Sequence, residues 1–143
     1  MNVPKIPNNS LTEEITELVS LCEKLAPEFG SKASWFYPPE SESKISEWEK
    51  ENGVTIPPSY KEWLEFSSDA QILHDTAIFY GVDMFGYSKQ YLPEDYIDIG
   101  KLIGDGQYLC FSKSTGKLIW FDHGDSLEYD NFKDVLNSIL DLI

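Results

Sequence analysis

The chain has 143 residues and a formal net charge of −14, from 25 acidic and 11 basic side chains. This is the length of one ordinary domain, and 41% hydrophobic residues are enough for a core and too many for a disordered tail. Every basic residue is a lysine and the acids are spread along the chain, so it lacks the basic stripe of a nucleic-acid binder, and an anionic membrane surface would repel it. A basic partner is the electrostatic match.

The beginning of the chain has helical periodicity. Apolar residues recur every three or four positions over 10–26, where Ser10 and Glu13 match a capping box. A first helix is therefore expected over 10–26, with Pro27 and Gly30 ending it. Residues 1–9 before it are expected to form a flexible lead-in.

Two further helices are predicted on either side of a sharp stop signal. The second begins near 41–43 and ends at Asn52-Gly53, because glycine commonly follows the last residue of a helix. The third covers 58–66, since proline is well tolerated in a first helical turn. The aromatic run 34–39 is broken by two prolines and is expected to be an ordered loop over the core.

The periodicity then changes to short β-rich runs. Gly104-Asp105-Gly106 predicts a hairpin, because these residues tolerate the positive φ angles of a tight turn. Strands are expected at 71–73, 77–82, 97–103, 107–111 and 117–122, and an amphipathic helix at 131–143. We therefore expect one α+β domain over 1–143, with N-terminal helices, a central antiparallel meander sheet and a C-terminal helix.

The sequence gives weak signals for catalysis or metal binding. His74 and His123 stand alone, without metal-ligand spacing. The acidic run 122–130 fails the EF-hand pattern and is expected to be a solvated loop ending in a strand. The chain has no G-x-S-x-G, P-loop or G-x-G-x-x-G motif. We expect no catalytic residue, metal or cofactor, while an enzyme that uses Asp122-His123 or Cys110 stays an open alternative.

The two cysteines indicate the compartment. Cys22 and Cys110 form no C-x-x-C pair and are expected to be buried free thiols, since free cysteine behaves as a small core hydrophobe. The N-terminal residues lack the apolar run of a signal peptide, and no window approaches about 18 consecutive apolar residues. We expect a protein of the reducing cytoplasm with no membrane span.

The second and third predicted helices carry a family pattern. In chain order it reads Trp48-Glu49, Asn52-Gly53, Ile56-Pro57 and Ser59-Tyr60-Lys61-Glu62-Trp63-Leu64. The predicted hairpin strands within 103–111 and 116–123 follow. This arrangement resembles the opening motif and hairpin of the SUKH superfamily, which is named for fungal cell-wall assembly regulators and their bacterial relatives. The resemblance covers about 40–143.

The resemblance implies a non-catalytic α+β domain that binds proteins. Bacterial members are encoded beside polymorphic toxins, often nucleases, and act as immunity proteins, and single-domain length favours this role. The implied partner is a basic toxin encoded nearby, and the free protein is expected to be a monomer or weak dimer. The alternative is a cytosolic scaffold or regulatory module of the cell-wall assembly type.

The residues of interest form two sets. The family-motif residues are expected to build the fold: Trp48, Glu49, Gly53, Pro57, Tyr60, Trp63, Leu64, Gly104 and Gly106. Partner contact is expected where exposed acid lies beside exposed aromatic side chains, because tyrosine often anchors interfaces. The candidates are Asp83, Tyr87, Tyr91, Glu94, Asp95, Asp98, Asp105, Asp122 and Asp125.

Overall fold

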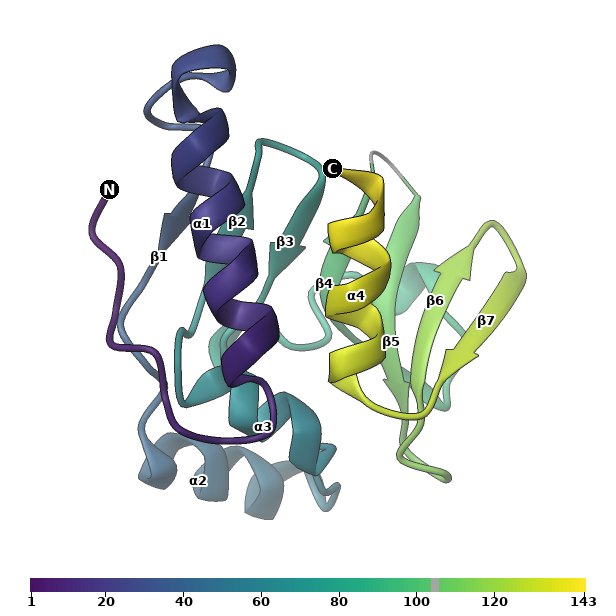
Figure 1. Ribbon diagram of the computed structural model, residues 1–143. Helices are drawn as coiled ribbons and strands as arrows, with labels where there is room; N and C mark the ends of the chain where they lie inside the picture. The colour runs from purple at the N-terminus through teal and green to yellow at the C-terminus, as the bar shows by residue number, and fades with distance from the viewer. Residues whose placement is uncertain (104–105) are drawn as a thin grey trace.

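A seven-stranded antiparallel meander lies at the centre of the computed structural model, which describes residues 1–103 and 106–143. Each strand pairs with the next along the chain, so the sheet order is β1-β2-β3-β4-β5-β6-β7 (Figure 1). The strands are β1 (Trp35–Phe36), β2 (Ala70–Ile72), β3 (Ala77–Phe79), β4 (Tyr96–Leu102), β5 (Gln107–Ser112), β6 (Leu118–Asp122) and β7 (Asp125–Tyr129).

Two long helices cover one face of this sheet. Figure 1 shows the first and last helices side by side in front of the strands, with the second and third helices at the lower end of the sheet. The helices are α1 (Thr12–Phe29), α2 (Glu42–Asn52), α3 (Pro58–Leu64) and α4 (Phe132–Leu142). The expected α+β domain with a C-terminal helix is confirmed.

The family-motif residues of α3 pack the helices against the sheet. Trp63 and Tyr60 of α3 are fully buried, with ring centroids 5.5 and 5.0 Å from the ring of Phe132 at the start of α4. Phe79 of β3 completes this aromatic cluster, 5.0 Å from Trp63. The backbone N–H of Phe132 donates to Ser59 Oγ at 2.9 Å, so the motif also holds the N-terminus of the last helix.

The ends of α2 and α3 follow the sequence signals. Gly53 has a φ of 62°, the left-handed conformation that lets the chain leave α2. Glu49 accepts a hydrogen bond from the backbone N–H of Ile56 at 2.8 Å and pairs with Lys61 at 2.9 Å, which holds the connection between the two helices. Pro57 precedes α3 as its N-cap residue, and the helix ends at Leu64, two residues before the expected end.

The start of α1 differs from the prediction. Ser10 does not cap the helix; its Oγ donates to the carboxylate of Glu62 at 2.8–2.9 Å instead. The side chain of Asn9 accepts from the backbone N–H of Leu11 at 2.8 Å. The helix also continues through Pro27 to Phe29, because a proline in the last turn forfeits a single intrahelical bond.

The lead-in 1–9 lies against the body of the protein. Val3 and Ile6 are partly buried against the core, and Thr12 Oγ1 donates to the backbone oxygen of Pro7 at 2.7 Å. These contacts fix its path, while its expected flexibility stays a prediction.

The run 34–39, expected as a loop, contains a short strand, and the acidic run 122–130, expected as a loop ending in a strand, is mostly strand. Trp35–Phe36 forms β1, which pairs with β2 and stops before Pro38, because proline cannot donate to the ladder. Of the three aromatic residues there, Phe36 is buried and Tyr37 is exposed. The acidic run 122–130 contains β7, joined to β6 by a tight turn at His123-Gly124, where φ is 49° and 95°.

The β4–β5 hairpin is confirmed where the structure describes it. Gly106 has the positive φ of 81° expected of a turn residue, whereas Gly104 and Asp105 lie outside the described residues.

Candidate protein-binding surface

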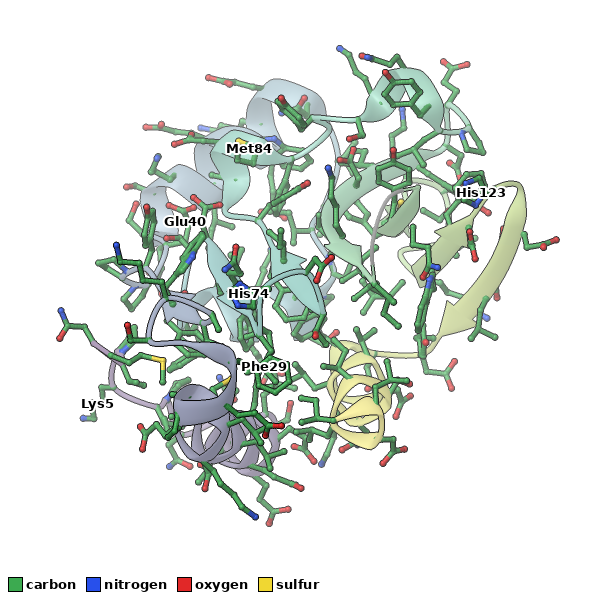
Figure 2. The ribbon with its side chains drawn as sticks, turned by 90° about the horizontal axis from the view of Figure 1, so that it is seen from above. Lys5, Phe29, Glu40, His74, Met84 and His123 are labelled. Carbon is green, nitrogen blue, oxygen red and sulfur yellow. The ribbon has the colours of Figure 1, made fainter. Side chains whose placement is uncertain are left out.

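The segment 82–95 joins β3 to β4 on the sheet face opposite to α1 and α4. Viewed from above, Met84 lies on one side of the sheet and the two helices on the other (Figure 2). The segment contains two short 3-10 turns, η1 (Val82–Met84) and η2 (Lys89–Tyr91). Asp98 of β4 is paired with Cys110 of β5, and both side chains point away from the core under the helices.

Asp98 anchors this segment from below. The residue is fully buried, its Oδ2 accepts the backbone N–H of Ser88 at 3.0 Å, and its backbone oxygen accepts the N–H of Gly86 at 3.0 Å. Burial raises the pKa of the Asp98 carboxyl above its ordinary range. The expectation of an exposed contact residue is therefore wrong for Asp98, because the segment 82–95 crosses over it.

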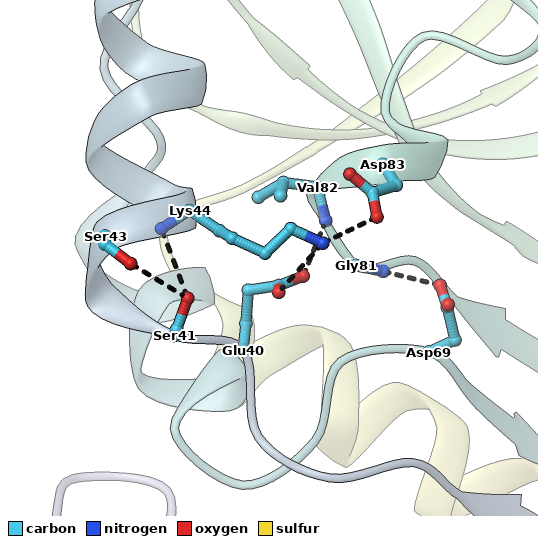
Figure 3. A network of polar contacts seen from close by, with 8 residues as sticks. All are labelled: Glu40, Ser41, Ser43, Lys44, Asp69, Gly81, Val82 and Asp83. Atoms are coloured by element: carbon cyan, nitrogen blue, oxygen red, sulfur yellow. Dashed lines mark hydrogen bonds and ion pairs between the residues drawn. The ribbon is translucent and has the colours of Figure 1, made fainter.

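Two further carboxylates hold the start of the segment. Glu40, which precedes α2, accepts the backbone N–H of Val82 at 3.0 Å, and Asp69 accepts that of Gly81 at 2.7 Å (Figure 3). Both bonds connect residues distant in sequence. The sequence does not reveal this role, because nothing local marks either acid as an acceptor for a backbone N–H.

The outer side of the segment carries exposed aromatic and acidic side chains. Tyr87 and Tyr91 are each 66% exposed, and Glu94 is also exposed. Asp83 is 2.6 Å from the ammonium of Lys44, and this hydrogen bond raises the pKa of Lys44 (Figure 3). The structure thus places four of the predicted contact residues on the exposed side of one anchored segment.

Asp95 has a structural role as a hydrogen-bond acceptor. Its carboxylate accepts hydrogen bonds from the hydroxyls of Ser112 at 2.5 Å and Ser114 at 2.9 Å, and from the backbone N–H of Ser114 at 3.0 Å. These bonds, that of Ser112 first, lower the pKa of Asp95. Asp95 therefore ties the segment to the turn between β5 and β6.

The β6–β7 hairpin is a second acidic region. Asp125 is exposed, and Asp122 is half-exposed with its carboxylate 2.5 Å from His123 Nδ1. Leu127 is 57% exposed on β7, and Glu128 beside it pairs with Lys117 at 3.4 Å. Leu127 is not among the predicted contact residues, because these are acidic and tyrosine side chains.

A cleft of about 500 Å³ lies beside the contact between α2 and the segment 82–95. Trp48, Phe85 and Tyr96 line it together with Lys89 and Lys113. Trp48 packs edge-on against Phe85 at 5.2 Å and is partly buried. Trp48 therefore packs against the core and also lines the cleft.

The described residues offer little for catalysis. Cys22 and Cys110 are buried free thiols, as predicted, and burial raises the pKa of both. A thiol of raised pKa is a poor nucleophile at neutral pH, which weighs against Cys110 in that role. Among residues 1–103 and 106–143, no group of three or more His, Cys, Asp or Glu side chains could hold a metal ion.

The comparisons with known proteins agree with the motif. The family model described as SMI1 / KNR4 family (SUKH-1) matches residues 39–138, so the chain belongs to this family. The family includes immunity proteins and Smi1/Knr4 regulators and is generally non-catalytic. Comparison with curated proteins gives no match. No helix in the described part of the chain is long and apolar enough to cross a membrane.

Proposed function

We propose that this domain is a non-catalytic, cytoplasmic immunity protein that neutralises a basic, nuclease-type toxin by binding it directly. Family membership supports a protein-binding role. The observation that carries the proposal is the combination of a net charge of −14 with Tyr87 and Tyr91, exposed on a segment held by buried carboxylates.

Charge supports the choice of a basic partner. Nucleases bind phosphates and therefore carry basic surfaces, and opposite net charge raises the rate of encounter in a salt-dependent way. Asp83, Glu94, Asp122 and Asp125 supply negative charge on two regions, the segment 82–95 and the β6–β7 hairpin. This electrostatic attraction steers the partner toward the domain.

The anchored segment supports specific contact. Exposed tyrosines contribute strongly to interfaces when they are held in place before binding, since less conformational entropy is lost. The backbone near Tyr87 is fixed by the bonds of Asp98 to Gly86 and Ser88. Tyr87 and Tyr91 are therefore the proposed aromatic anchors.

The test is co-expression with a toxin-like gene encoded next to this one. The immunity role predicts relief of toxicity and a 1:1 complex that resists dilution but weakens with salt. Binding of several cytosolic proteins without relief of toxicity would instead favour the scaffold or regulatory role, the other known role in the family. Light scattering of the free protein checks the expected monomer or weak dimer.

A further inference from the structure

The outer edge of β7 is open. Within the described residues β7 pairs with β6 alone, as the last strand of the meander, and Figure 1 shows no other element beside it. Asp125, Ser126, Leu127 and Glu128 are all exposed. The opposite edge is different, because β1 has two residues and ends before Pro38.

The pairing of β7 with β6 shows which backbone N–H and C=O groups of β7 do not bond to β6. Asp122 and Asp125 flank the two-residue turn and form the closing pair of the hairpin. In an antiparallel ladder, residues whose N–H and C=O point to the neighbouring strand alternate with residues whose groups point away. Counting from the closing pair, Ser126 and Glu128 direct their backbone groups outward. These two residues can accept one further strand.

The side chains along this edge specify what can pair with it. Leu127 lies on the helix-covered face beside Trp120, the residue opposite it in β6. Asp125 precedes it on the same face, and Glu128 is on the other face. The edge thus offers one apolar position flanked by two carboxylates.

We propose that β7 is a docking strand, to which an extended lysine- or arginine-bearing segment of the partner protein adds as an eighth strand. This rests on the proposed function, which requires a basic partner, and deepens it by naming the element and the mode of binding. Main-chain hydrogen bonds of such an added strand give affinity, and its alternating side chains give specificity. The segment places an apolar side chain against Leu127 and basic ones against Asp125 and Glu128.

A second copy of this chain is the wrong occupant. Edge-to-edge pairing of two β7 strands would bring Asp125 and Glu128 of one copy toward those of the other, in molecules of charge −14 each. Charged side chains on an edge strand are a known barrier to self-association. The same carboxylates that oppose a second copy attract a basic strand.

The test uses a seven-residue peptide capped at both ends, Thr-Thr-Lys-Val-Thr-Lys-Thr, and hydrogen exchange of the domain followed by NMR. As an antiparallel eighth strand this peptide sets its lysines against Glu128 and Asp125 and its valine against Leu127. The peptide is expected to slow exchange of the Ser126 and Glu128 amides by at least about tenfold at saturation. Ser126→Pro removes the outward N–H but no bond to β6, so it should fold and bind at least about tenfold more weakly, while Ser126→Ala binds normally. Unchanged binding by a folded Ser126→Pro, or unchanged amide exchange, overturns the proposal.

A charge swap remains informative if the proline variant does not fold. Asp125→Lys/Glu128→Lys should lose binding of this lysine peptide and gain binding of the same peptide with glutamate in place of both lysines. The matched control Glu23→Lys/Asp75→Lys changes the net charge equally at exposed positions away from β7 and should keep the original preference. If the two double variants show the same preference between the two peptides, the outer edge of β7 is not the binding site.

The two proposals fail separately. A native basic partner that binds the wild type and Ser126→Pro equally refutes the docking strand and leaves the immunity role intact. Peptide addition at β7 without relief of toxicity by the domain refutes the immunity role alone.

Discussion

The carboxylates that hold the segment 82–95 accept hydrogen bonds from the protein's own backbone, whereas the carboxylate of Asp125 on the β6–β7 hairpin faces solvent. Glu40, Asp69 and Asp98 each accept a backbone N–H, and Asp98 is fully buried. Asp125 is exposed and has no such internal task within the described residues.

The number of acidic residues in a region therefore does not locate a binding surface. In the anchored segment the carboxylates build a rigid support, and the exposed tyrosines on it are the expected contacts. In the hairpin the carboxylates themselves are the expected contacts. The following changes test this division of roles.

The largest effect is expected from removing both exposed rings of the anchored segment. Tyr87→Ala/Tyr91→Ala should weaken partner binding by about 2–4 kcal/mol, or about 30- to 700-fold in Kd, because exposed tyrosines on a fixed backbone act as anchors. Calorimetric titration with the partner measures this. Tyr87→Phe/Tyr91→Phe keeps the rings and serves as control, and equal binding by the alanine variant would place the interface elsewhere.

The next effect concerns a carboxylate that supports the segment. Glu40→Ala should lower the free energy of unfolding by about 1–3 kcal/mol, because the buried N–H of Val82 loses its acceptor. Urea denaturation measures the change. Asp125→Ala on the hairpin should change stability by less than about 0.5 kcal/mol, and a similar loss in both variants would contradict the comparison.

Asp98 should give a pH dependence of stability. Its folded-state pKa is raised by burial, so the ionised form costs stability at neutral pH, and this cost is relieved as the pH falls through the raised pKa toward the unfolded value of about 4. The free energy of unfolding of the wild type should therefore rise relative to that of Asp98→Asn as the pH is lowered from 7. Denaturation curves at several pH values measure this difference, and a constant or falling difference would show that Asp98 is not destabilised by burial.

The smallest effect is expected from neutralising the hairpin. Asp122→Asn/Asp125→Asn should lower the association rate with a basic partner severalfold at low salt and reduce its salt dependence, with stability unchanged. Stopped-flow kinetics at two ionic strengths measures the rates. Glu23→Gln/Asp75→Asn removes the same charge elsewhere, and an equal loss of rate would assign the effect to net charge alone.

Local signals predicted much of the fold. Gly53 after α2 and proline at the start of α3 act within a few residues, and both helices appear where expected. The β4–β5–β6 meander follows from short apolar runs between turn residues. The family motif also predicted burial of Tyr60 and Trp63.

The errors come from contacts between distant segments. Ser10 bonds Glu62, 52 residues away, instead of capping its own helix. Asp98 is buried because another segment crosses it, and Glu40 finds its backbone partner 42 residues later. Periodicity describes neighbours along the chain, so it cannot separate these structural carboxylates from the exposed ones.

The most direct test of the proposed binding surface is a hydrogen-exchange footprint of the complex with the basic partner encoded nearby. Amides of 83–94 and of β7 should become protected in the complex, while the exposed faces of α1 and α4 should exchange as in the free protein. Protection confined to α1 and α4 would contradict the account and move the interface to the helical side of the sheet.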